Sequence, residues 1–117
     1  DVLVVVGDMA DTFHQICRGL GMLKSKFRRV FYTPGCHEFW VTVPEMNQFH
    51  DSFAKMHAIM EACDNMGIDI APAPVCQELF IVPLYSWYNC LFDEKDPFPD
   101  ADVDQNPLCK WPINKDE

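Results

Sequence analysis

The apolar residues in the first third of the chain follow two different periods. Residues 2–6 form an unbroken aliphatic run, VLVVV, which is typical of a strand buried on both faces. From Phe13 to Phe27 apolar residues recur every three or four positions, which predicts a helix with one buried face. Residues 29–33 predict a second strand, which Pro34 ends. This order predicts a parallel β-α-β unit with a right-handed crossover.

The middle of the chain predicts a second helix after an irregular stretch. Residues 39–50 show no clear period. Asp51 or Ser52 can cap a helix, and Gly67 stands where a C-terminal glycine belongs. We expect the inner face of this helix to carry four apolar side chains, namely Phe53, Met56, Met60 and Cys63.

The remaining residues predict two short strands and a tail. A third strand covers residues 68–70 and ends at Pro72 and Pro74, and a fourth covers residues 79–84. Residues 92–117 are acidic and rich in proline, which predicts a loop or tail without periodic structure. The predicted fold class is therefore α/β, with an incomplete core over residues 1–91. Because the chain opens on Asp1 without a Met, we interpret it as an excised or incomplete piece.

Composition restricts the partners. The 117 residues carry a net charge of -9, with 18 acidic and 9 basic residues. An acidic chain without a basic stripe argues against nucleic acid and anionic membranes as partners. Six cysteines are present without a CxxC pair, and Cys17 and Cys63 fall on apolar helical positions, which favours buried free thiols. We therefore expect a reducing, cytoplasmic setting.

Two acidic residues follow the first strand. Asp8 comes directly after Gly7 at the end of the strand. Its carboxylate suits a hard divalent cation, and a turn residue or helix cap is an equally good interpretation. Asp11 immediately precedes the helix, so capping is the better interpretation there. Thr12 and Gln15 have capping-box spacing.

A second cluster of functional side chains follows the second strand. Parallel strands place their carboxyl ends at one edge of a sheet, so His37 should lie near Asp8. A neutral imidazole binds metal, and a protonated one donates to a leaving oxygen. Glu38 is expected to hold the His37 ring by accepting a hydrogen bond. The two loops together predict a metal or phosphate site.

Cys36 admits three interpretations: a thiolate ligand, a nucleophile or a plain small residue. A phosphatase nucleophile needs a nearby arginine, and residues 37–43 contain none. As a soft ligand, a thiolate favours zinc over magnesium. The other histidines, His14, His50 and His57, lie on or near helices and are interpreted as solvated or structural.

These residues together resemble a known family. The run Val-Gly-Asp-Met-Ala-Asp, a helix and then Thr-Pro-Gly-Cys-His-Glu is similar to two central blocks of the calcineurin-like metallophosphoesterases. The resemblance covers roughly residues 1–91. It implies part of a four-layer α/β/β/α core and a two-metal site for Mn, Fe or Zn. By position Asp8 would bridge the metals, His37 would protonate the leaving group, and Glu38 would orient His37.

The chain departs from the family pattern in three places. Cys36 stands where the family carries an Asn ligand, and neither the Asp-x-His block nor the Gly-His-x-His block is present. The first hypothesis is a metal-dependent phosphoester hydrolase with a phosphoester substrate, weakly active or inactive in this form. The missing ligands would come from the rest of the protein or from a second subunit. The second is a catalytically degenerate fold that serves as an interaction module. A nucleotide-binding domain is disfavoured because no glycine-rich phosphate loop occurs.

Overall fold

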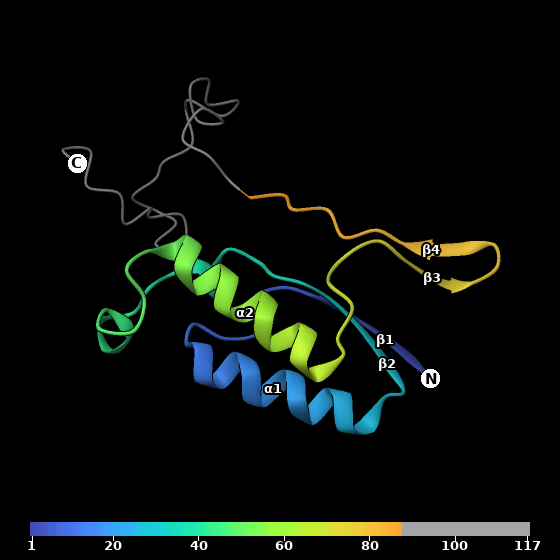
Figure 1. Ribbon diagram of the computed structural model, residues 1–117, viewed down its shortest axis with the longest axis horizontal. Coiled ribbons are helices and arrows are strands. Elements are labelled where there is room, and N and C mark those ends of the chain that lie inside the picture. Colours follow the sequence, from blue (N-terminus) through green and yellow to red (C-terminus); the bar gives the residue numbers. More distant parts are fainter. Residues whose placement is uncertain (88–117) are drawn as a thin grey trace, which may run out of the picture.

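The computed structural model describes residues 1–87 and is built on a parallel strand pair. Strand β1 (Val2–Val6) pairs with β2 (Arg29–Thr33), and helix α1 (Phe13–Lys26) connects them (Figure 1). The register runs from Val2 opposite Arg29 to Val6 opposite Thr33. The predicted α/β class and the β-α-β unit are confirmed. The predicted tail at residues 92–117 lies outside the described residues.

Helix α1 is held by its apolar stripe and its cap. Ile16 and Leu20 are fully buried, four positions apart. Thr12 is the N-cap, and its side chain accepts a hydrogen bond from the Gln15 amide. The prediction that Asp11 caps this helix is therefore wrong, because the Thr12 side chain takes the cap position and the Asp11 carboxylate contacts His37 instead.

Helix α2 (Ser52–Met66) packs beside α1 and begins and ends as predicted (Figure 1). Asp51 caps its first turn, and Gly67 ends it with a left-handed φ of 66°. The predicted inner face is largely wrong. The buried positions are Lys55, Ile59 and Cys63, whereas Phe53 is 72% exposed and lies on a different face.

The third predicted strand is reduced to a single parallel bridge. Asp69 bridges Phe31, and its backbone exchanges hydrogen bonds with Val30 and Tyr32. The Asp69 carboxylate also pairs with Arg29, 2.8 Å from the guanidinium Nε. Residues 68–70 therefore continue the sheet on the far side of β2, without the length of a regular strand.

A hairpin that was not predicted follows. Strands β3 (Ala73–Cys76) and β4 (Leu79–Ile81) pair in antiparallel fashion (Figure 1). Pro74 was expected to stop a strand, but it lies beside a shift in register between Pro74 and Cys76. A proline is tolerated at such an irregularity because its missing amide proton is not needed there. Strand β4 is also shorter than the predicted range 79–84.

The first strand is not buried on both faces as its sequence predicted. Its residues alternate, with Leu3 and Val5 packed against the core and Val4 and Val6 exposed by 48% and 77%. Within residues 1–87, the helices cover one face of the sheet, so one face stays open. The core between sheet and helices contains seven buried residues: Ile16, Leu20, Val30, Tyr32, Ile59, Cys63 and Ile68.

The cysteines and helices of the described part bear on two further expectations. Within residues 1–87 the four cysteines are free, Cys63 is buried and Cys17 is half-buried. Burial raises the pKa of the Cys63 thiol to about 12. The described helices include none with the length and apolarity required to cross a bilayer. The cytoplasmic setting stays a prediction.

Candidate metal and phosphoester site

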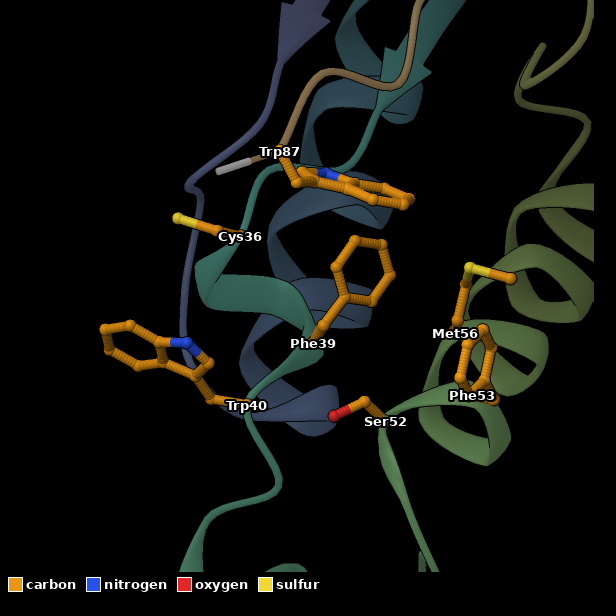
Figure 2. A pocket seen from close by; sticks show the side chains of 7 residues that line it. All are labelled: Cys36, Phe39, Trp40, Ser52, Phe53, Met56 and Trp87. Atoms are coloured by element: carbon orange, nitrogen blue, oxygen red, sulfur yellow. The ribbon is translucent and has the colours of Figure 1, made fainter. Parts of the chain in front are cut away.

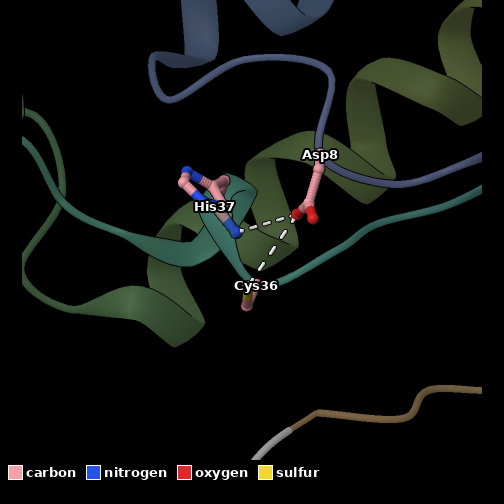
Figure 3. Close-up of side chains that lie close together, drawn as sticks. All are labelled: Asp8, Cys36 and His37. Atoms are coloured by element: carbon pink, nitrogen blue, oxygen red, sulfur yellow. Dashed lines mark hydrogen bonds between the residues drawn. The ribbon is translucent and has the colours of Figure 1, made fainter. Parts of the chain in front are cut away.

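The loops that follow β1 and β2 meet at one edge of the sheet, as the sequence predicted. Asp8 comes from the first loop, and Cys36 and His37 come from the second (Figure 3). One potential ligand atom from each of the three side chains lies within 4.8 Å of the others. The sequence separates Asp8 from Cys36 by 28 positions, so the parallel register creates this cluster.

Two glycines let the loops approach each other. A Cβ on Gly7 would lie 2.5 Å from the Gly35 nitrogen, and Gly7 has a φ of 72°. A Cβ on Gly35 would lie 2.2 Å from Asp8 Oδ1 and 2.7 Å from the Asp8 nitrogen. Such distances exclude any side chain at either position. The glycines are therefore required for the contact that brings Asp8 to the second loop.

Asp8 adopts an unusual backbone conformation. Its φ is 53°, in the left-handed region that non-glycine residues rarely adopt. Its Oδ1 accepts a hydrogen bond from the His37 amide at 3.3 Å and lies 3.9 Å from the Cys36 thiol (Figure 3). Strained residues of this kind concentrate at functional sites. The conformation directs an exposed carboxylate toward the second loop.

The Glu38 carboxylate holds the two loops together. It is fully buried, and its carboxylate accepts hydrogen bonds from the amides of Asp8, Met9 and Gly35 at 2.7–3.0 Å. The expectation that Glu38 orients the His37 ring is therefore wrong. Adjacent residues of a tight turn point in different directions, and Glu38 points into the gap between the loops while His37 points outward.

Asp11 is the residue that holds His37. Its Oδ1 lies 2.9 Å from the His37 Nδ1. An ionised carboxylate only accepts hydrogen bonds, so the Nδ1 carries the proton and the Nε2 faces away from Asp11. The Trp40 ring lies against the imidazole, with centroids 4.0 Å apart. In the sequence, the Gly-Asp-x-x-Asp spacing of Asp8 and Asp11 could have indicated that both carboxylates belong to the site. The interpretation of Asp11 as a helix cap hid this indication.

A buried ion pair lies behind these residues. Lys55 of α2 is fully buried, and its Nζ lies 2.9 Å from Glu45 Oε2. Burial by itself raises the pKa of Glu45. Hydrogen bonds from the Phe13 amide, Lys55 and Thr42 outweigh that effect and lower the pKa to about 2. Sequence reasoning missed this pair, although Lys55, Ile59 and Cys63 share one helical stripe.

Two hollows flank the cluster. An open groove on the Asp8 side is lined by residues that include Asp11, Gln15 and His37. An apolar pocket of about 270 Å³ lies on the other side, and Cys36 belongs to its rim. Aromatic rings form much of its wall, with Phe39 edge-on to Trp87 at 4.6 Å (Figure 2). The cluster therefore lies between a polar surface and an apolar one.

The donor set fits a divalent transition metal. A carboxylate, a thiol and an imidazole are ligands that zinc and iron accept, whereas magnesium prefers oxygen alone. Three protein donors are also the number that open catalytic zinc sites use. Asp8 and Cys36 are exposed and His37 is half-buried, so an ion and a substrate can reach them. The other histidines, His14, His50 and His57, are exposed and lie outside this cluster.

Comparison with known proteins identifies one relative. No protein-family model matches the chain. Over 98 residues it is 33% identical to the acyl-carrier-protein phosphodiesterase PptH of Mycobacterium tuberculosis, covering 79% of this chain and 30% of the relative. The crystal structure of that phosphopantetheinyl hydrolase superposes with a TM-score of 0.61 and 32% identity, over 73% of this chain and 32% of that chain.

The relative confirms the α/β fold, and it supports the resemblance to phosphoester hydrolases in its coarser form. Over 79% of its length, the chain is homologous to part of a phosphodiesterase. It spans about 30% of the length of that protein. The roles of Asp8, Cys36 and His37 stay predictions.

Proposed function

We propose that this chain forms part of a metal-dependent phosphodiesterase. The observation that carries the proposal is the convergence of Asp8, Cys36 and His37 within 4.8 Å at the edge of a parallel sheet. The similarity to a phosphodiesterase over 98 residues supports the same reaction class. A metal-free phosphatase mechanism has less support, because no arginine lies near Cys36 in the second loop.

The residues have separate roles in this proposal. Asp8 and Cys36 would hold a divalent cation. The imidazolium form of His37 donates its Nε2 proton to the leaving oxygen and becomes the neutral tautomer with the proton on Nδ1. Asp11 keeps the Nδ1 proton in place and thereby fixes the ring orientation. A bound cation supplies Lewis-acid stabilisation of the phosphoryl oxygens. Glu38 acts indirectly, because it fixes the backbone of both loops.

Zinc or iron fits this donor set better than manganese does, because Cys36 replaces the oxygen donor expected from the family. With His37 as the proton donor, Asp8 and Cys36 supply two of the ligands of one ion. In a two-metal site the second ion takes its remaining ligands from outside this cluster, either from another part of the protein or from a second subunit.

The substrate class follows from the relative and the pocket. PptH is named for acyl carrier protein and the phosphopantetheinyl group, and we extend that class to this chain. The apolar pocket beside Cys36 offers room for an extended, partly apolar group attached to the phosphorus. A compact phosphomonoester would leave this pocket unused.

Asp8→Ala tests the proposal in the full-length protein. We expect loss of bound zinc or iron in elemental analysis and at least a 100-fold loss of hydrolysis of bis(p-nitrophenyl) phosphate. His57→Ala is the matched control, because His57 is exposed on α2 and lies outside the cluster. Full activity in Asp8→Ala would overturn the assignment.

The second candidate is a degenerate fold that serves as an interaction module. The observation that favours this candidate is that Cys36 stands at the position where the calcineurin-like metallophosphoesterases carry an Asn metal ligand. Cys36→Asn separates the two candidates. New metal binding or new activity in Cys36→Asn would show that the natural site is degenerate. An active natural protein whose activity Cys36→Asn leaves unchanged would show that the thiol is a tolerated neighbour of the metal.

A further inference from the structure

A fully buried lysine lies behind the candidate site. Lys55 occupies the buried face of α2 with 0% exposure. Lysine side chains are almost never fully buried without a partner. Lys55 donates hydrogen bonds to three acceptors: Glu45 Oε2, the carbonyl oxygen of Asp11 and the carbonyl oxygen of Trp40. All three protons of its ammonium group therefore have acceptors.

The two carbonyl groups belong to the residues that touch the His37 ring. Asp11 contacts the Nδ1 of His37 through its carboxylate, and Trp40 lies against the ring face. Asp11 comes from the loop after β1, and Trp40 comes from the segment after the 3-10 helix His37–Phe39. Lys55 therefore binds the backbone of both neighbours of His37 at once, from a rigid helix.

Glu45 completes the arrangement. It lies in the 3-10 helix Val43–Glu45 and is 6% exposed. Its Oε1 accepts from the Phe13 amide at 2.6 Å, and its Oε2 accepts from Thr42. The carboxylate thus joins the start of α1 to the same ammonium group. A shift of α2 would move Asp11 and Trp40 together.

We propose that Lys55, held by Glu45, is the positioning residue for His37. Replacing buried ion pairs with apolar residues is often neutral for stability, so stability alone is a poor reason for this pair. An ammonium group, in contrast, binds two carbonyl oxygens that no apolar side chain could hold. The proton-donor role of His37 rests on the proposed function, whereas the placement of its ring by Lys55 is independent of metal and substrate.

The test is imidazole NMR on the full chain at one fixed pH, without metal or substrate. In the unaltered protein, the imidazole ¹⁵N shifts of His37 should report one tautomer with the proton on Nδ1, bound to Asp11, and Asp11→Asn identifies this Nδ1–H signal by altering it. In Lys55→Met we expect loss of the Nδ1–H signal and a mixture of tautomers. The exposed His14 and His57 provide internal references that should not change.

Ile59→Ala is the matched control, because Ile59 is buried on the same helix one turn further on and packs in the core. It should weaken the fold and keep the Nδ1–H signal. Retention of that signal in folded Lys55→Met would overturn the proposal, as would its loss in Ile59→Ala. If Lys55→Met does not fold, Glu45→Gln is measured in its place. Loss of the Nδ1–H signal is expected in Glu45→Gln, and retention of that signal would contradict the proposal. A chain that binds no metal still gives either result.

Discussion

Two buried glutamates hold the two halves of the candidate site in different ways. Glu38 accepts only backbone amides, from Asp8, Met9 and Gly35. Glu45 combines the Phe13 amide with a buried ion pair to Lys55. The first arrangement fixes the loops that carry the metal donors. The second fixes the surroundings of the proton donor from helix α2.

The difference between them shows what each half of the site needs. Amide donors are local, so Glu38 can join two loops that already touch at Gly35. Asp11 and Trp40 present carbonyl oxygens, which a carboxylate cannot bind, so a hydrogen-bond donor must reach them from elsewhere. Lys55 supplies that donor, and Glu45 compensates the charge of Lys55 in a site from which water is excluded.

The largest expected effect concerns acid stability. The folded-state pKa of Glu45 is about 2, below its ordinary value of 4.5. The stabilisation is therefore fully present above about pH 4.5 and is lost as the pH falls toward about 2. The difference between these pKa values corresponds to about 3 kcal/mol. Urea unfolding followed across this pH range measures the loss.

Glu45→Gln separates this loss from other acid effects. Asp51 and Asp69 also have lowered pKa values, mainly from the Ala54 amide and from Arg29 respectively, and both remain in the variant. The unfolding free energy of Glu45→Gln should therefore fall less between pH 4.5 and pH 2 than that of the unaltered chain. Equal pH dependence in the two proteins would show that Glu45 is not held as the structure indicates.

Glu38→Gln should have the next largest effect. The change replaces one acceptor oxygen with an NH₂ group that faces backbone N–H donors. An unsatisfied buried amide costs about 1–3 kcal/mol, so we expect a loss of about 2 kcal/mol in the free energy of unfolding. Glu61→Gln is the control, because Glu61 is exposed on α2. A loss below about 0.5 kcal/mol would mean that the Glu38 amide contacts are dispensable.

The sequence was most informative where one local pattern determined the structure. The aliphatic run 2–6, the helical stripe after Phe13 and the cap at Asp51 depend on neighbours in the chain, and all three elements form. Gly67 likewise adopts the left-handed conformation that its position predicted. The exposure of Val4 and Val6 could not be predicted from the local pattern, because the burial of a strand residue depends on which other elements cover the sheet.

The candidate site was predictable in its location and less so in its contacts. Parallel strands bring their carboxyl ends together, so the meeting of Asp8 with Cys36 and His37 followed from topology. Which carboxylate faces His37 depended on the direction of each side chain in a tight turn. Spacing alone favoured the adjacent Glu38, whereas the folded chain uses Asp11.

The smallest effect concerns the backbone of Asp8, which Glu38 holds through the Asp8 amide. At a φ of 53°, a glycine is tolerated without the steric strain that an alanine Cβ introduces. Asp8→Gly should therefore be about 1 kcal/mol more stable than Asp8→Ala, as measured by urea unfolding. Both variants should lose bound metal equally, since neither has a carboxylate. Equal stability of the two variants would show that the backbone of residue 8 leaves the left-handed region once the Asp8 side chain is removed. In that case the Asp8 side chain, and not the hydrogen bond to Glu38, maintains the conformation.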